Sequence, residues 1–531
     1  MSLTHRREDG FDNEDLSIIS NIDEENESLN HNEIMLSHYS TNQYDKYHQE
    51  FRPLLLGRIS TRNDDSEEVV QLASPPFITR HKQREYQLLI PTCFYFKSNN
   101  DRQPRCFKKG STHSPKNCFP SKKVYTLTCL IVLFLPLVSF VIFCTIYFSP
   151  ISLPEPTTMT VLSSSSSSSS SSLPSPHLLT FNLFMRPPGI KNNENDYKTE
   201  RLNYIIRHVL PLYDIITFQE AFAYANRRID HLLKAAYELG FVYHVASSRH
   251  YPWDLGGDGG LLLLSRYPII KANQIEFPRG IHSDWLSYKG ALHALIKINP
   301  THLIHIYTTH TQASYDNHGE LNMDDTKVRL SQFALVHQFI EETSKEDTYP
   351  ILLMGDLNVD AAIHDNKTSL DIPSYGSSLA YTMMMDVLKG KGTNLKLMND
   401  AINNTTPSAT QTNAAINEST IYRTLWRLDD LTDMAYKTFG YHPVTFGDVK
   451  RLENGTLIPN EVILTSHNQL LTVQSIDRIL WATRNDKNQI NMTLDNITVE
   501  HFFVDQKNGT SLPFTQLSDH YGLSARLYIT K

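Results

Sequence analysis

An uncharged and mostly apolar run of 26 residues, at positions 124–149, constrains this chain more than any other feature. A helix needs roughly 20 apolar residues to cross a bilayer, and this run is long enough. A cleaved signal sequence would lie at the N-terminus and have a shorter apolar core, so a membrane anchor is favoured. Pro136 lies inside the run, and membrane helices tolerate proline. We therefore expect one transmembrane helix at residues 123–149.

The residues on the two sides of this run indicate its orientation. Lysines precede it at Lys108, Lys109, Lys116, Lys122 and Lys123, whereas Glu155 is the first charge after it. Cytosolic flanks are enriched in Lys and Arg, so we expect a single-pass protein with a cytosolic N-terminus and a luminal or extracellular remainder. Eight glycosylation sequons, which matter only in a luminal domain, follow the run, at Asn366, Asn403, Asn404, Asn417, Asn454, Asn491, Asn496 and Asn508. Asn- and Thr-rich sequence also creates sequons by chance.

Composition divides the rest of the chain into three parts. Residues 1–122 are polar and lack periodicity, so we expect a disordered cytosolic tail. Residues 150–176 include ten consecutive serines flanked by prolines, which predicts a flexible stalk between the membrane and the remainder. Residues 177–531 alternate short apolar runs with helical patterns, as a globular domain does. All five cysteines lie before residue 150, so this domain can form no internal disulfide.

Strands and helices are expected to alternate in the domain. The apolar runs predict strands at residues 178–184, 214–218, 260–264, 291–298, 303–309, 351–354, 475–482 and 523–529. Helical patterns occur at residues 199–209, 224–239 and 324–342. This order suits a two-sheet α/β sandwich. Residues 361–466 are expected to form an insertion, in which residues 380–390 could be an amphipathic lipid-contacting helix, although a core helix is favoured.

Polar residues lie within or directly after these expected strands. They are Asn182, Glu220, His310, Asp356 and Asn358, followed near the end of the chain by Asp477, Asp519 and His520. A carboxylate or imidazole at the end of a buried strand is costly unless it is paired or binds a metal. Each residue alone has an ordinary explanation, such as an aspartate that caps a turn or a hydrogen-bonded histidine. The complete ordered set predicts one shared site.

This ordered set resembles the endonuclease/exonuclease/phosphatase superfamily, also called DNase I-like, over residues 177–531. The segments "THTQA" around His310 and "SDWLSYKGAL" are most similar to neutral sphingomyelinases. In that family an Asp and a Lys five residues apart precede a strand, and Asp284 and Lys289 have this spacing; solvated loop charges are the alternative. The resemblance implies a four-layer α/β/β/α sandwich that hydrolyses sphingomyelin to ceramide and phosphocholine.

Phosphodiester hydrolysis requires an activated water, neutralisation of charge and a stabilised leaving group. By hypothesis, Glu220 holds Mg²⁺, with Asn182 nearby and Asp519 in or just outside the metal shell. Hard oxygen ligands suit Mg²⁺. His520 is expected to be the general base, oriented by Asp477 on its other ring nitrogen.

The other residues of the set are expected to act on the nucleophile and the phosphate. Asp356 and Asn358 would position the attacking water, and His310 would donate to the phosphoryl oxygens. Lys289 would contact phosphate or, paired with Asp284, switch a loop between two states.

Other functions remain open at this stage. "DRILW" at residues 477–481 and "GDLN" are also similar to inositol polyphosphate 5-phosphatases. A nuclease is disfavoured, and no nucleic-acid partner is expected, because the net charge is −8 and disulfides are lacking. A third alternative is an inactive, membrane-tethered binding module, yet every motif position retains a competent residue. Activation by anionic lipids stays an open question.

Overall fold

The computed structural model describes residues 122–154, 175–254, 256–314, 322–363, 374–394, 420–484, 492–504 and 512–529. The predicted tail lies outside these ranges except for its last residue, and so does the serine run. Two of the eight sequons that follow the run, Asn454 and Asn496, are described, and both side chains are exposed.

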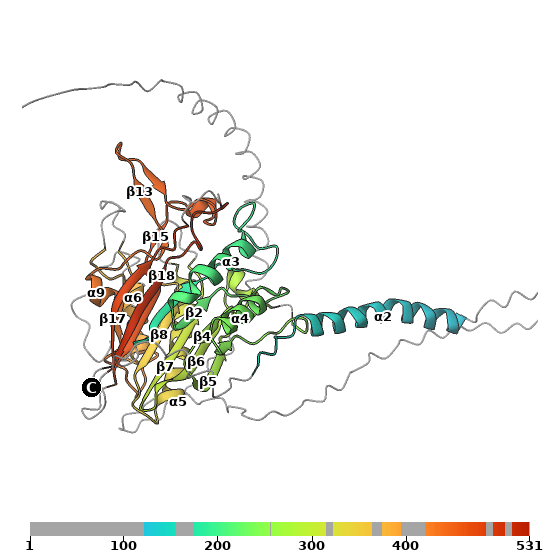
Figure 1. Cartoon of the computed structure of the whole chain (residues 1–531), viewed down its shortest axis with the longest axis horizontal. Helices are drawn as coiled ribbons and strands as arrows, with labels where there is room; N and C mark the ends of the chain where they lie inside the picture. Colours follow the sequence, from blue (N-terminus) through green and yellow to red (C-terminus); the bar gives the residue numbers. More distant parts are fainter. Residues whose placement is uncertain are drawn as a thin grey trace, which may run out of the picture. The chain divides into compact units, whose positions relative to one another are not determined.

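Helix α2 (Lys122–Tyr147) covers most of the apolar run and contains Pro136 (Figure 1). By length and composition it could cross a membrane, and nearly all of its side chains are exposed in the structure. The prediction of one long apolar helix here is confirmed.

Two six-stranded sheets form the framework of the domain. The first sheet contains, in spatial order, β17 (Met492–Glu500), β18 (Gly522–Ile529), β1 (His177–Asn182), β2 (Ile215–Gln219), β4 (Leu262–Ser265) and β3 (Tyr243–Ala246). The second sheet contains β11 (Thr432–Asp433), β16 (Asp477–Ala482), β8 (Ile351–Asp356), β7 (His302–His310), β6 (Gly290–Asn299) and β5 (Ile269–Glu276). The pairs β1/β2 and β7/β8 are parallel, and the other neighbours are antiparallel.

Apolar side chains from the two sheets pack in one shared cluster, to which Leu178 of the first sheet and Leu352 of the second belong. Every residue of β2, β4, β8 and β16 is buried, as occurs when both faces of a sheet are covered. The continuous apolar runs in the sequence reflect this double burial.

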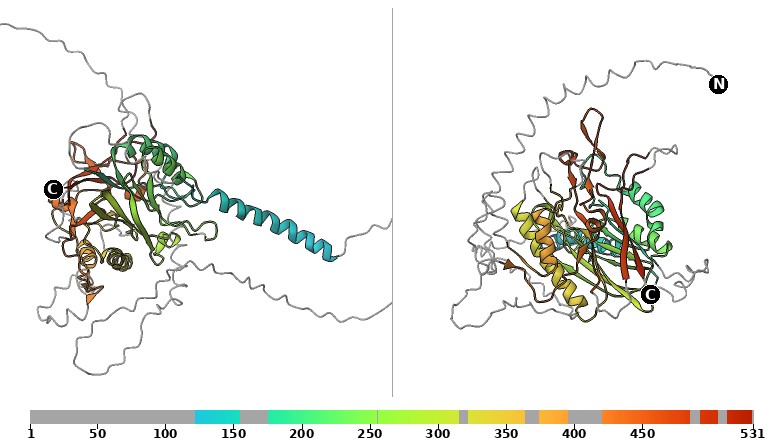
Figure 2. Two further views of the ribbon diagram at one scale, coloured as in Figure 1. Left: turned by 60° about the horizontal axis from the view of Figure 1, so that its bottom comes forward. Right: turned by 90° about the vertical axis from the view of Figure 1, so that its left-hand side faces the viewer.

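Two pairs of helices cover the sheets. Helices α3 (Lys198–His208) and α4 (Arg228–Glu238) pack against the first sheet, where they share a cluster with Phe218. Helices α5 (Met323–Ser344) and α6 (Leu379–Leu388) pack against the second sheet with Leu353. Figure 2 shows the green pair α3 and α4 apart from the yellow and orange pair α5 and α6. The fold is therefore a mixed α/β fold in which two sheets pack together and helices cover them.

The predicted strands and helices are confirmed to within a few residues, but β3, β5 and β17 were not predicted, and neither were the short strands between residues 393 and 474. The exposed β5 alternates weakly, β3 is only partly buried, and β17 contains Asp495 and Asn496 at a bulge. Edge strands and irregular strands lack the continuous apolar run that marks a buried strand.

Parts of the predicted insertion at residues 361–466 belong to the scaffold. The short strand β11 extends the second sheet beside β16. Helix α6 buries Met383, Met384 and Leu388 in the cluster that includes α5, so it is a core helix, and the lipid-contacting alternative is wrong.

The remaining described elements here are β9 (Thr393–Asn394), β10 (Thr420–Ile421), α9 (Met434–Phe439), β12 (Phe446–Gly447), β13 (Val449–Arg451), β14 (Leu457–Pro459), and, beyond residue 466, β15 (Val473–Gln474). Short 3-10 helices lie at Leu210–Leu212, His282–Leu286 and His467–Gln469.

The first residues of the predicted stalk pack onto the domain. Ile151 and Leu153 contact the apolar cluster of α3, α4 and the first sheet. Phe148 lies edge-on to Tyr251, with 5.4 Å between ring centroids. These side chains are apolar enough to be buried, so the chain is held against the domain before it reaches the serine run.

Candidate active site

Six of the predicted site residues lie at the ends of strands that the sheets bring to one edge. Asn182 ends β1, Glu220 follows β2, and His310 and Asp356 end the parallel strands β7 and β8. Asp477 begins β16, which is antiparallel to β8, and is registered directly opposite Asp356. His520 precedes β18, which is antiparallel to β1. The beginnings of β16 and β18 therefore lie at the same edge as the ends of β1 and β8.

Asn182 joins the two sheets through its side-chain amide. Its Nδ2 donates to Asp356 Oδ2 at 3.0 Å and to Glu220 Oε1 at 3.3 Å. The same atom lies 3.3 Å from His520 Nε2. Asn182 is fully buried. Asn182, a polar residue in an otherwise apolar strand, therefore lies at the centre of the site.

His520 is held by Asp477, as predicted. Its Nδ1 lies 2.9 Å from Asp477 Oδ2, and its ring packs against Phe446. Burial lowers the pKa of His520, but Asp477, Asp356 and Asp519 outweigh burial and raise it to about 10. Without a cation nearby, these carboxylates therefore hold His520 in the protonated form.

The buried Lys289 and the partly buried Asp284 are partners in the site. Lys289 Nζ lies 2.8 Å from Asp284 Oδ2, donates to Thr311 O at 2.7 Å, and lies 3.1 Å from His310 Nε2. Only 6% of Lys289 is exposed, so the alternative of solvated loop charges is wrong for it. Burial and the charge of Lys289 lower the pKa of His310 well below its usual value. His310 Nε2 also lies 3.4 Å from Asp356 Oδ2, which connects this pair to the rest of the site.

Asn358 and Asp519 lie beside these contacts. Asn358 donates its backbone N–H to Asp356 Oδ1 at 3.0 Å and its side-chain amide to Thr311 O at 3.1 Å. Burial and the negative charge of Glu220 raise the pKa of Asp519 to about 7, while His520 opposes them. Burial and Asp477 likewise raise the pKa of Asp356 to about 7.

The site has features that fit a divalent cation. Glu220 Oε2 and Asp477 Oδ1 are buried carboxylate oxygens without a hydrogen-bond partner among the described residues. Asp356, Asp477 and His520 present possible ligand atoms within 4.8 Å of one another. Uncompensated buried carboxylates are costly, and a cation would neutralise them. This geometric group differs from the predicted ligands Glu220, Asn182 and Asp519, although all six residues belong to the same site.

Three supporting residues were not predicted from the sequence. The fully buried Arg201 of α3 donates to Leu183 O and Phe184 O after β1, and to Leu517 O before His520. Gln219 Nε2 donates to Thr180 Oγ1 and Thr308 Oγ1 and so connects the two sheets. Thr445 Oγ1 accepts from the backbone N–H of Asp477. Of these three residues, only Arg201 could have been noticed in the sequence, because it is an arginine on the apolar face of a helix.

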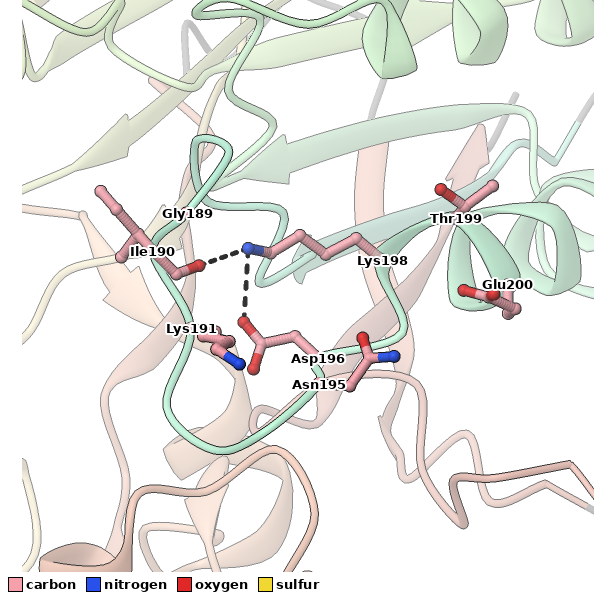
Figure 3. A pocket seen from close by; sticks show the side chains of 8 residues that line it. All are labelled: Gly189, Ile190, Lys191, Asn195, Asp196, Lys198, Thr199 and Glu200. Atoms are coloured by element: carbon pink, nitrogen blue, oxygen red, sulfur yellow. Dashed lines mark hydrogen bonds and ion pairs between the residues drawn. The ribbon is translucent and has the colours of Figure 1, made fainter.

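A pocket of about 310 Å³ lies in the loop between β1 and α3 (Figure 3). Lys198 lies 3.4 Å from Asp196 Oδ2 there and also donates to Ile190 O. The pocket lining contains none of the predicted site residues.

Comparison with known proteins gives the family of the chain. The sequence pattern of the Endonuclease/Exonuclease/phosphatase family matches residues 179–520. A protein named sphingomyelinase from Dictyostelium discoideum is 29% identical over 485 residues, which cover 67% of this chain and 99% of the relative. Sphingomyelinase C from Bacillus cereus is 26% identical over 212 residues, which cover 38% of this chain and 62% of the relative.

One solved structure was found to superimpose on part of the chain. Sphingomyelinase C from Streptomyces griseocarneus superimposes with a TM-score of 0.39 and 19% identity, over 66% of this chain and 99% of that one. The family match begins within β1 and extends to His520 of the site, two residues before β18. The chain is a sphingomyelinase-like member of the endonuclease/exonuclease/phosphatase family.

Proposed function

We propose that this protein is a membrane-anchored, Mg²⁺-dependent phosphodiesterase that hydrolyses sphingomyelin to ceramide and phosphocholine. The observation that carries the proposal is the continuous buried set of contacts from Glu220 through Asn182 and Asp356 to His520 and Asp477. The names of the relatives support sphingomyelin as the substrate.

Glu220, with Asn182 and Asp519 beside it, would hold the cation. When bound, Mg²⁺ neutralises charge on the phosphoryl group and on the leaving alkoxide. A positive charge among these carboxylates also opposes the effect that raises the pKa of His520 to about 10. Cation binding would therefore favour the neutral imidazole that a general base requires.

His520 accepts a proton from the attacking water at Nε2, because Asp477 occupies Nδ1. Asp477 fixes the tautomer and the orientation of the ring. Asp356, which lies 3.9 Å from His520, and Asn358, whose N–H donates to Asp356, position the water. His310 and Lys289 donate to the phosphoryl oxygens, and Asp284 holds Lys289 in place.

The proposal also includes the membrane topology of the chain and the number of layers in the fold. Helix α2 is the single membrane span, the preceding lysines lie in the cytosol, and the domain is luminal or extracellular. The exposed sequon Asn454, in the turn between β13 and β14, supports this side of the membrane. The helix pairs on the two sheets support a four-layer α/β/β/α sandwich.

A substrate panel tests the activity. The purified full chain would be assayed in mixed micelles on sphingomyelin, phosphatidylcholine, a phosphoinositide and DNA, with Mg²⁺ and with chelator. We expect phosphocholine release from sphingomyelin that stops with chelator and returns with Mg²⁺. An anionic lipid added to the same micelles tests for lipid activation.

The variant His520→Ala is the control for a contaminating activity. Release from the phosphoinositide or DNA alone would assign the site to another reaction of the family. No turnover of any substrate by the folded protein would support the inactive binding module instead.

A further inference from the structure

Two loops of the domain, residues 249–254 and 279–288, pack together and are called the paired loops below. Tyr288 donates its hydroxyl to Asp254, and Arg279 lies 3.6 Å from the same carboxylate. The Arg279 guanidinium lies 3.5 Å from the centre of the Tyr288 ring. A bridge between Gly257 and Ser287 adds a backbone contact. The paired loops are therefore one structural unit.

Large apolar side chains project from the paired loops into solvent. Trp253 is 76% exposed, Trp285 is 61% exposed and Leu286 is 55% exposed. Exposed tryptophan is costly in water, and a group of exposed apolar side chains in one unit indicates a contact surface. Tryptophan favours the lipid headgroup region, where its ring is buried and its N–H remains hydrated.

The first of the paired loops is in contact with the end of α2. Tyr251 donates its hydroxyl to Cys144 Sγ at 3.8 Å and packs edge-on against Phe148. Arg249 donates to Phe148 O at 3.1 Å. A helix that crosses a bilayer ends at the bilayer surface, and Trp253 is two residues from Tyr251. The contacts thus place Trp253 beside that surface.

The second of the paired loops belongs to the active site. Trp285 directly follows Asp284, which pairs with the buried Lys289 and accepts the backbone N–H of Ala313 at 2.7 Å. A bilayer that contacts Trp285 and Leu286 would therefore lie next to the residues that receive the substrate headgroup.

We propose that the paired loops dock on the bilayer that α2 crosses, with Trp253, Trp285 and Leu286 in its headgroup layer. The occupant is a choline-phospholipid surface. This inference rests on the membrane anchoring in the proposed function and adds a second contact that orients the domain. The continuity of the paired loops with the end of α2 favours lipid over a second copy of the chain.

Quenching of tryptophan fluorescence tests this contact without any catalytic measurement. The chain contains four tryptophans: Trp253, Trp285, Trp426 and Trp481. The full chain would be reconstituted into phosphatidylcholine vesicles, isolated by flotation, and compared in vesicles with and without brominated acyl chains. We expect bromolipid to quench the wild type, and the double variant Trp253→Ser/Trp285→Ser to lose this quenching.

Two further variants complete the design. Trp426→Phe removes a partly buried tryptophan of the domain core and should leave the quenching intact. Leu286→Ser retains both loop tryptophans and should reduce the quenching of each. Equal loss of signal in the Trp426→Phe variant, or equal quenching in the double variant, would overturn the proposal.

The outcomes separate this inference from the proposed activity. Floated wild type that bromolipid does not quench overturns the docking surface alone. Emission that depends on protein concentration instead of bromolipid assigns the surface to a second copy and also overturns it. Quenching without sphingomyelin hydrolysis overturns the activity alone, whereas a wild type that does not float overturns the anchoring and the docking together.

Discussion

At the scale of single residues, the active site is marked by a group of buried carboxylates. Glu220, Asp356, Asp477 and Asp519 are opposed by a protonated His520, by Arg186 and Arg201 beside Asp519, and by Lys289, which is itself paired with Asp284. The carboxylates raise the pKa of His520 to about 10 despite its burial. The same excess of negative charge gives the site affinity for a cation, so metal binding and the state of His520 are linked.

The variant His520→Ala should lose turnover by roughly 100-fold or more, because a general base contributes 10²–10⁴-fold. Phosphocholine release from sphingomyelin measures the loss, and calorimetric titration with Mg²⁺ should still show binding. His231→Ala changes an exposed histidine of α4 and serves as the matched control. Near-normal turnover in His520→Ala would remove His520 from the mechanism.

The variant Glu220→Gln should raise the Mg²⁺ concentration for half-maximal activity by roughly tenfold or more, because Glu220 Oε2 has no other partner among the described residues. A Mg²⁺ titration of activity and of thermal stability measures this shift. Glu238→Gln makes the same change at an exposed position of α4. An unchanged titration would mean that the cation is held elsewhere.

At the scale of elements, the second sheet contains a buried histidine pair between β6 and β7. His293 Nε2 lies 2.8 Å from His305 Nδ1, and His305 Nε2 lies 3.0 Å from Asp347. Burial and the neighbouring His305 lower the pKa of His293 from 6.5 to about 3. The sheet is therefore assembled around a neutral imidazole.

This pair makes the stability of the sheet dependent on pH. Below pH 6.5 the unfolded chain protonates His293, whereas the folded chain does so only near pH 3. The free energy of unfolding should fall by about 1.4 kcal/mol per pH unit in this range through His293. Urea unfolding of the full chain in detergent at pH 7, 6 and 5 measures the slope. His293→Gln should be less steep, and identical slopes would contradict the assignment.

At the scale of the whole molecule, α2 and the domain divide the chain between two compartments in our proposal. Residues 148–153 pack onto the domain directly after α2, so the domain is held close to the end of the helix. The serine run lies outside the described residues. In the sequence it connects Ile151 and Leu153, which pack on the domain, to β1, which begins at His177.

Protease protection in microsomes tests this topology. Added protease should remove an epitope placed in residues 1–122 and leave the domain intact, and a glycosidase should reduce the mass of the domain. Asn454→Gln should remove one glycan, because Asn454 is exposed in a turn, whereas Asn468→Gln, outside any sequon, should not change the mass. A digested domain with a protected tail would reverse the orientation.

Much of the fold could be read from local patterns. The buried strands appear as apolar runs because both of their faces are covered, and α3 and α4 follow the periodicity of one apolar face. The edge strand β11 could not be predicted, since two residues carry no periodicity and its place depends on pairing with β16. Arg201 was missed for a related reason, because its partners are backbone carbonyls from distant loops.

The sequence by itself determined the apolar span, the order of the site residues and the family that this order resembles. Those features depend on composition and on the local period of the side chains. Only the tertiary structure decided which residues meet: Asn182 lies 338 positions before His520, yet their side chains are 3.3 Å apart. Such contacts require the pairing and packing of both sheets, and local sequence does not encode the register between distant strands. For the same reason, the burial of Lys289 and the contact of the loop at Tyr251 with the end of α2 became visible only in the folded chain.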